Sequence, residues 1–264
     1  MPETPDREKR RRTFDEVAEL YARGRPRYPD FVIDDVVELA RFGPGSRVVE
    51  IGCGTGQATK GLAERGLDVT CVELGPRLAE VARQELAPYP RVRVVNADVE
   101  HWQPEAAPYD GVAAFTAFHW VDPERRYQLA AAMLRADGAL AVVSIHHVMP
   151  PDADPFYFEI QEDYRAVGMA GDGAPPPPDE IVGIAADIDA SGLFCPVAVR
   201  RREWEVVDTA DDHIALINTY SPNLLLPEEQ RQELFARIRR RIDARPDGTV
   251  RKSMLAVVQV ARRR

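Results

Sequence analysis

The sequence predicts an α/β fold built on a doubly wound parallel sheet. Short apolar runs alternate with amphipathic helical segments between residues 47 and 145, which is typical of parallel strands covered by helices on both faces. Three glycines lie within five positions directly after the first apolar run, at the end of a strand where ligands bind to such sheets. The chain has 264 residues, of which 45% are hydrophobic, so one large domain with a smaller insertion is expected.

The spacing of apolar residues assigns the elements of this sheet in order. Two helices are expected first, at 14–24 and 31–43, each closed by glycine. The expected strands are 47–51, 67–74, 92–98, 111–118 and 139–145. The helices between them are expected at 57–66, 76–86 and 123–138. Crossovers between the parallel strands should be right-handed.

The alternation ends at residue 149, where proline-rich stretches begin. Helices are expected at 156–169 and 181–192, a long strand at 195–207, helices at 211–219 and 227–243, and a last strand at 253–263. The final two strands are expected to form an antiparallel edge. The predicted organisation is a basic tail (1–13), a ligand-binding core (14–148), a lid over the substrate (149–194) and the rest of the core with a helical insertion (195–264).

Composition excludes several classes of protein. The net charge of −9 disfavours nucleic acid or an anionic membrane as the main partner. The three cysteines are widely spaced and show no metal-binding pattern, which favours a reduced, cytoplasmic setting. No apolar run is long enough to span a membrane, and the N-terminal region lacks the pattern of a secretory signal.

The glycine-rich turn, Gly52-Cys53-Gly54-Thr55-Gly56, differs from the dinucleotide pattern G-x-G-x-x-G because its third glycine comes one residue early. Glu50 precedes it by two positions. An acid there suits a ligand that carries an ammonium group and would repel a phosphate.

Two further acids follow the next strands. Glu73 ends the second strand, where a carboxylate can accept both hydroxyls of a ribose. Asp98 ends the third strand and is placed to accept a hydrogen bond from the adenine amine. The four features describe a ligand with adenine, ribose, no phosphate and an amino-acid end, and S-adenosyl-L-methionine fits this description.

Over residues 14–145 the chain resembles the class I S-adenosylmethionine-dependent methyltransferases, through VVEIGCGTG, VTCVELGPRL, NADVEHW and AFHWVDPE. YARGRPRYP and HWVDP resemble a bacterial small-molecule subgroup. The resemblance implies a Rossmann-like seven-stranded sheet of order 3-2-1-4-5-7-6 with strand 7 antiparallel. It also implies the following cofactor-binding residues: Tyr21, Arg25, Glu50, Gly52, Cys53, Gly54, Thr55, Gly56, Glu73, Leu74, Asp98, Val99, Thr116, Ala117 and Phe118.

Histidines are the candidate bases. His119 follows the fourth strand close to the expected methyl group, but packing against Trp120 is the favoured explanation. His146 and His147 follow the fifth strand, and neighbours in an extended chain point to opposite sides, so no metal site is expected. His146 and Trp120 are assigned to the substrate pocket.

Three aromatic residues are also assigned to the substrate pocket. Tyr28 lies in the segment that folds over the cofactor in the resembling subgroup. Phe156 belongs to the predicted lid, where it either contacts the substrate or forms part of the lid's own core. Tyr220 lies in a second segment expected to face the same pocket.

The predicted function is methylation of a small-molecule acceptor, such as a secondary metabolite, with S-adenosyl-L-homocysteine as product. One alternative is an enzyme that binds the same cofactor but catalyses a non-methylating reaction such as cyclisation. A second is an RNA methyltransferase, which the acidic charge and the absence of an Asn-Pro-Pro-aromatic motif oppose. The sequence predicts neither the methylated atom nor the oligomeric state.

Overall fold

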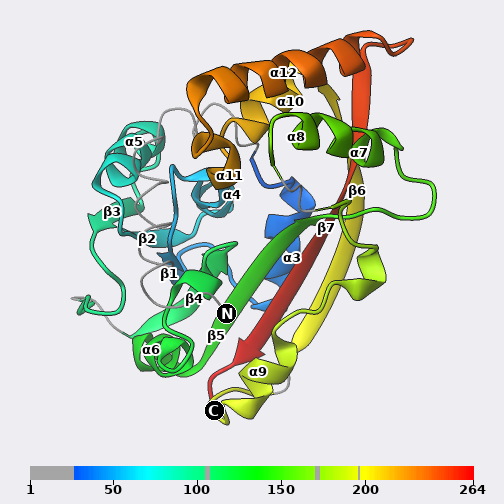
Figure 1. The fold of residues 1–264 in the computed structure, drawn as a ribbon. Coiled ribbons are helices and arrows are strands. Elements are labelled where there is room, and N and C mark those ends of the chain that lie inside the picture. Colours follow the sequence, from blue (N-terminus) through cyan, green and yellow to red (C-terminus); the bar gives the residue numbers. More distant parts are fainter. Residues whose placement is uncertain (1–26, 105–107, 170–172, 196) are drawn as a thin grey trace.

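The computed structural model describes residues 27–104, 108–169, 173–195 and 197–264. Its centre is a seven-stranded sheet of order β3-β2-β1-β4-β5-β7-β6 (Figure 1). The first five strands are mutually parallel, and β7 runs antiparallel to both β5 and β6. This confirms the predicted order. The strands are β1 (Arg47–Ile51), β2 (Asp68–Glu73), β3 (Val92–Asn96), β4 (Tyr109–Phe115), β5 (Leu134–His147), β6 (Ala198–Thr209) and β7 (Thr249–Arg262).

Each face of the sheet has its own hydrophobic core. One core packs α3 (Asp30–Leu39), α4 (Gln57–Glu64) and α5 (Pro76–Leu86) against the sheet. The other packs α6 (Arg126–Met133) and α9 (Ala185–Ala190) against the opposite face. The sheet is therefore doubly wound, as its strand–helix alternation predicts.

A helical cap lies at one end of the long strands β6 and β7 (Figure 1). Its side chains form a separate core that includes Phe156, Leu234 and Ile238. The helices of this region are α7 (Phe156–Glu159), α8 (Gln161–Ala166), α10 (Ala210–Ile217), α11 (Ser221–Leu224) and α12 (Glu228–Asp243). The cap thus joins the predicted lid to the later helical insertion.

The main departure from the predicted elements concerns β5. A helix was expected over 123–138, but α6 ends at Met133 and β5 begins at Leu134. The first residues of β5 pair irregularly with β4: Leu134 pairs with Tyr109, and regular pairing resumes at Ala139. Asp137, with φ of 59°, lies in the intervening bend.

Two predictions concern residues outside the described ranges: the basic tail 1–13 and the helix 14–24. Among the described helices, none combines the length and the apolar character needed to cross a membrane.

Candidate active site

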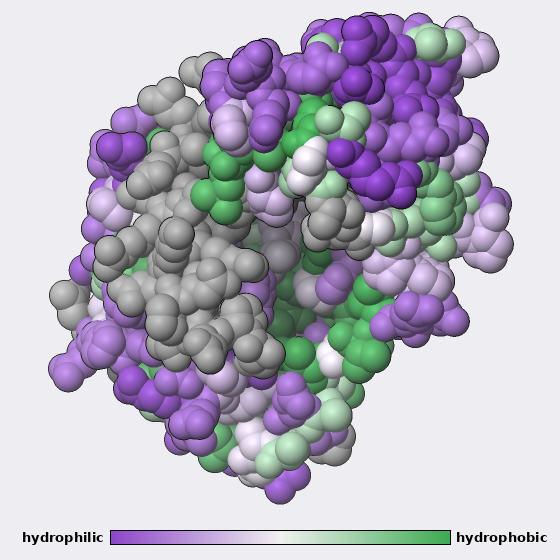
Figure 2. Space-filling model, in the orientation of Figure 1, coloured by the Kyte–Doolittle hydropathy of each residue, from purple (hydrophilic) through white to green (hydrophobic). Residues whose placement is uncertain are grey.

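Two adjoining cavities open along the carboxyl ends of β1, β2 and β4. The edge cavity, about 210 Å³, lies beside β2 and the end of β3. The cap cavity, about 390 Å³, extends from β1 toward the cap. Gly52, Gly54, Phe115 and Thr116 line both cavities. Figure 2 shows the molecule hollowed on this face, with hydrophobic side chains inside the hollow.

The glycine turn after β1 requires residues without side chains. Gly52, Gly54 and Gly56 have φ of 67°, 58° and 94°, in the left-handed region that only glycine adopts without strain. A Cβ atom on Gly52 would lie 2.8 Å from Cβ of Ala117. The turn therefore exposes bare backbone at the junction of the two cavities.

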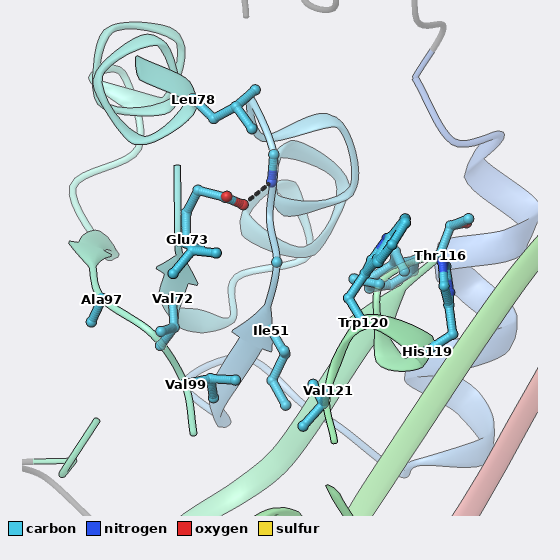
Figure 3. A pocket seen from close by; sticks show the side chains of 15 residues that line it. Ile51, Val72, Glu73, Leu78, Ala97, Val99, Thr116, His119, Trp120 and Val121 are labelled. Carbon is cyan, nitrogen blue, oxygen red and sulfur yellow. Dashed lines mark hydrogen bonds between the residues drawn. The ribbon is translucent and has the colours of Figure 1, made fainter. Parts of the chain in front are cut away.

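Glu73, at the end of β2, points back toward this turn (Figure 3). Its Oε2 accepts a hydrogen bond from the Gly54 amide and its Oε1 accepts one from the Gly75 amide, each at 2.9 Å. The side chain is nearly buried. Two backbone donors thus fix the carboxylate at the edge cavity, and each of its oxygens has the capacity for more than one hydrogen bond.

The rest of the edge cavity is largely apolar. Leu74, Ala97, Val99 and Trp120 line it (Figure 3). Asp98, by contrast, is not among the lining residues. Its Oδ1 accepts a hydrogen bond from the Glu100 amide, and its Oδ2 lies 3.4 Å from Nδ1 of His101.

Glu50 lines the cap cavity but is 1% exposed. Its Oε2 accepts a hydrogen bond of 2.7 Å from the hydroxyl of Thr59. Burial, together with the negative charge of Glu73, raises the pKa of Glu50 to about 7. Among the described residues the structure records no ion pair for Glu50.

Thr116 follows β4 and has φ of 52°. A β-branched residue in this region is strained, and such strain is concentrated at functional sites. The Tyr28 hydroxyl and Oγ1 of Thr116 share a hydrogen bond of 2.9 Å, and the Thr116 amide donates to the Val143 carbonyl. Both Tyr28 and Thr116 line the cap cavity.

His119 lines the edge cavity from the short 3-10 helix η1 (Phe118–Trp120). Its ring centroid lies 4.7 Å from that of Trp120. Partial burial and the positive charge of Arg126 lower the pKa of His119 below its usual range, so the imidazole is neutral at neutral pH.

One face of the antiparallel part of the sheet forms a wall of the cap cavity. Ile145 and His147 come from β5, and Trp204 and Val206 from β6; from β7 come Lys252 and Met254. The strand register pairs Met254 with both His147 and Trp204, and Lys252 with Val206.

His146 does not line this cavity, because successive strand residues face opposite sides of the sheet. Its Nε2 lies 2.8 Å from Oγ of Ser144.

The remaining predicted residues occupy different environments. Cys53, Leu74, Ala117, Trp120 and Tyr220 line one of the cavities. Four others are not among the lining residues: Thr55 accepts a hydrogen bond from Gln57, Gly56 precedes α4, Phe118 packs on Tyr127, and Phe156 is fully buried in the cap core. Tyr21 and Arg25 lie outside the described residues.

Sequence reasoning did not single out Arg27, Trp204, Lys252 or Met254, all of which line the cap cavity. Arg27 lies two residues after Arg25 and donates a hydrogen bond to Glu64. Within the described ranges, no cluster of three or more His, Cys, Asp or Glu side chains is arranged to hold a metal ion.

Comparison with known proteins agrees with this geometry. Residues 48–138 match a family model described as a methyltransferase domain. An uncharacterized methyltransferase of Mycobacterium tuberculosis strain H37Rv is 36% identical over 131 residues, 50% of this chain and 51% of that protein. A protein-L-isoaspartate O-methyltransferase of Gloeobacter violaceus is 37% identical over 114 residues, 42% of this chain and 53% of that protein. The chain thus spans about half the length of these curated relatives.

A solved structure resembles nearly the whole fold. It is a proposed type II methyltransferase from Anaeromyxobacter dehalogenans, with a TM-score of 0.63 and 21% identity, covering 90% of this chain and 97% of that one. The matches confirm the likeness to the class I S-adenosylmethionine-dependent methyltransferases that the motifs predict.

Proposed function

We propose that this chain transfers a methyl group from S-adenosylmethionine to a small-molecule acceptor. The observation that carries the proposal is the sequence of groups along one continuous crevice. Buried Glu50, the bare backbone of Gly52 and Gly54, and amide-held Glu73 follow one another along it.

The residues present fit the proposed cofactor. Glu50 would meet its ammonium group, whose positive charge would favour the ionised form of an acid that burial otherwise keeps at a pKa of about 7. Glu73 would accept hydrogen bonds from the ribose hydroxyls. Ala97, Val99 and Leu74 would pack against the adenine. When bound, the cofactor supplies an activated methyl group on a positively charged sulfur.

The protein's contribution to such a reaction is mainly positional. Methyl transfer requires the acceptor atom and the methyl group to be held in line, about 3–3.5 Å apart, with water excluded. The strained Thr116 lines both cavities, and its partner Tyr28 lines the cap cavity beside it. The acceptor would lie in the cap cavity, on the far side of Thr116 from Glu73.

The size and lining of the cap cavity support a small acceptor. It measures about 390 Å³, within the range of sites for small molecules. Aromatic and aliphatic side chains such as Trp204, Leu216 and Met254 form much of its surface. A net charge of −9 gives no general attraction to nucleic acid.

Calorimetry tests the cofactor assignment, with S-adenosylmethionine and NAD titrated separately into the protein. Saturable binding of the first and none of the second is expected, and the reverse would overturn the proposal. Formation of S-adenosylhomocysteine with an acceptor would then distinguish methyl transfer from a reaction that leaves the methyl group in place, such as cyclisation.

A further inference from the structure

A cluster of buried polar side chains lies at the cap end of the cap cavity. Nζ of Lys252 donates a hydrogen bond of 2.8 Å to Oδ2 of Asp208, and Nδ1 of His213 lies 3.9 Å from the same oxygen. The rings of His147 and Tyr157 are 4.1 Å apart, and the ring of His213 is 6.1 Å from that of Tyr157. These five residues are called the polar cluster below.

Several atoms of the polar cluster have no partner in the structure. Nε2 of His147, the hydroxyl of Tyr157 and both ring nitrogens of His213 are buried without a hydrogen bond among the described residues. Buried polar atoms are paired in about 90% of cases, so four orphans at one place require an explanation. Of the residues that carry these atoms, only His147 lines the cavity, so a ligand there could reach His147 but not Tyr157 or His213.

Only part of the polar cluster is accessible from the cavity. His147 and Lys252 line it, whereas Asp208, His213 and Tyr157 lie behind them. The two lining residues come from β5 and β7 and project from the same face of the sheet as Trp204, Val206 and Met254. A ligand that fills the cavity would therefore meet one polar end and mostly apolar walls.

This polar end is far from the glycine turn. The Thr116 amide bonds to the carbonyl of Val143, and His147 follows Val143 by four residues along β5. At a rise of about 3.3 Å per residue, the separation along the strand is about 13 Å. A group held by His147 is thus at the opposite end of the ligand from the atoms near Thr116.

Charge decides what kind of group this end accepts. Asp208 already compensates the ammonium of Lys252, so an additional carboxylate would be buried without a counter-charge. Burial, followed by the positive charge of Lys252, lowers the pKa of His147 to about 3, which leaves its ring neutral. A hydroxyl accepts a hydrogen bond from Lys252 and can donate to or accept from a neutral imidazole, depending on the tautomer.

We propose that His147 and Lys252 bind the hydroxyl of an elongated, mainly aromatic small molecule whose other end reaches Thr116. This inference rests on the proposed function where it identifies the molecule as the acceptor of the methyl group. The binding itself requires no methyl donor. The acceptor is then oriented from a distance, with the anchored hydroxyl distinct from the atom that is methylated.

Three biphenyls of matched shape test the inference by calorimetry without cofactor: 4-phenylphenol, 4-methylbiphenyl and biphenyl-4-carboxylate. The phenol is expected to bind about tenfold more tightly than the other two, the difference given by one or two hydrogen bonds to buried partners. His147→Phe should reduce this preference to about threefold, because Lys252 can still donate to the hydroxyl. It should leave the binding of 4-methylbiphenyl within about threefold of the unmodified protein, since no hydrogen bond to that probe is lost. A joint Lys252→Met and Asp208→Asn variant, which leaves no uncompensated charge, should act in the same way.

His146→Phe is the matched control, because it changes the neighbouring histidine on the other face of β5. It should leave the preference for the phenol unchanged. Equal affinity for the three probes, tighter binding of the carboxylate, or no saturable binding up to about 1 mM would overturn the inference. Loss of the preference in His146→Phe alone would also overturn it.

Separate measurements distinguish a failure of this inference from a failure of the proposed function. Binding of S-adenosylmethionine depends on Glu73 and the glycine turn and is measured without a biphenyl. Selective binding of the phenol without binding of S-adenosylmethionine would retain the hydroxyl site and reject the methyl-transfer proposal. The opposite result would reject only the hydroxyl site.

Discussion

The hydroxyl of Tyr28 lies 2.9 Å from Oγ1 of Thr116, a residue 88 positions later in the chain. This hydrogen bond ties the segment before α3 to the end of β4. It also holds a β-branched residue whose φ is 52°. The contact therefore joins the two elements that border the junction of the cavities.

Tyr28→Phe removes this hydrogen bond and retains the ring contact with Phe115, whose centroid is 5.1 Å away. The free energy of unfolding should fall by about 1 kcal/mol, the usual net contribution of one hydrogen bond. Binding of S-adenosylmethionine should weaken as well. Chemical denaturation and calorimetry measure the two effects.

Tyr89→Phe is the control for this change. It also removes one hydroxyl, which donates a hydrogen bond to Glu64 on the surface. It should leave cofactor affinity unchanged. Equal loss of affinity in both variants would show that Tyr28 has no particular role at the site.

Glu73→Ala should weaken binding of S-adenosylmethionine at least tenfold. The substitution removes the carboxylate and frees the amides of Gly54 and Gly75, and hydrogen bonds to charged groups contribute about 1.5–3 kcal/mol each. Glu80→Ala, at an exposed position of α5, serves as the control. Cofactor affinity that is unchanged in Glu73→Ala would mean that the ligand lies elsewhere.

Gly52→Ala should destabilise the fold by more than the same substitution at a left-handed glycine that has open space around it. Its Cβ would meet Ala117 at 2.8 Å, in addition to the strain of φ at 67°. Gly192→Ala is a matched control, since φ there is 70° and no atom lies within 4 Å of the added Cβ. We expect the control to lose about 1 kcal/mol and Gly52→Ala a further 1–3 kcal/mol, roughly, as well as its affinity for the cofactor. Equal losses in the two variants would contradict the close packing at Gly52.

Much of this arrangement could be predicted from the sequence. The strands of the parallel part are continuous apolar runs, and the glycine turn with the acids at 50 and 73 marks the carboxyl edge. The start of β5 could not be predicted, because residues 134–138 have no strand pattern and pair through an irregularity with β4. Local propensity carries no information about such pairing.

The choice between His146 and His147 was also beyond the sequence. Alternation along the strand places the two rings on opposite faces, but it does not say which face borders a cavity. That depends on β7, which pairs with β5, and on β6, which pairs with β7, and both pairings form only in the folded chain. Lys252 was missed because it lies just before the predicted last strand. The sequence therefore did not assign it to a strand face that borders a cavity. For Phe156 the sequence left two alternatives open, contact with the substrate and a place in the lid's own core. The structure places it in the core of the cap.

His119 gives a test of whether a histidine base takes part in the reaction. General bases contribute about 10²–10⁴-fold, whereas the contact with Trp120 supports a packing role. We expect His119→Gln to lower kcat less than tenfold and to reduce the thermal midpoint slightly. A loss of a hundredfold or more in kcat at unchanged stability would identify His119 as the base instead, within the range that such groups contribute.

The last prediction concerns Glu50, whose pKa of about 7 is above the ordinary glutamate value of 4.5. The folded state holds this proton more tightly than the unfolded state, so the stabilising effect is full below pH 4.5 and is lost as the pH rises to about 7. Glu50→Gln lacks the ionisation and should be more stable than the unmodified protein at pH 8, by up to about 3 kcal/mol, with the difference shrinking toward pH 5.

The same substitution should weaken binding of S-adenosylmethionine at pH 8, because a buried carboxylate that faces the ammonium is lost. In the unmodified protein, affinity should fall as the pH decreases below 7 and Glu50 becomes protonated, a trend that Glu50→Gln should not show. Glu229→Gln, at an exposed position of α12, controls for the substitution itself. Thermal unfolding and calorimetry at several pH values measure both effects. A Glu50→Gln variant that is less stable at pH 8 would contradict the buried, uncompensated charge of this acid, and one that binds as tightly as the unmodified protein would show that Glu50 does not meet the ammonium group.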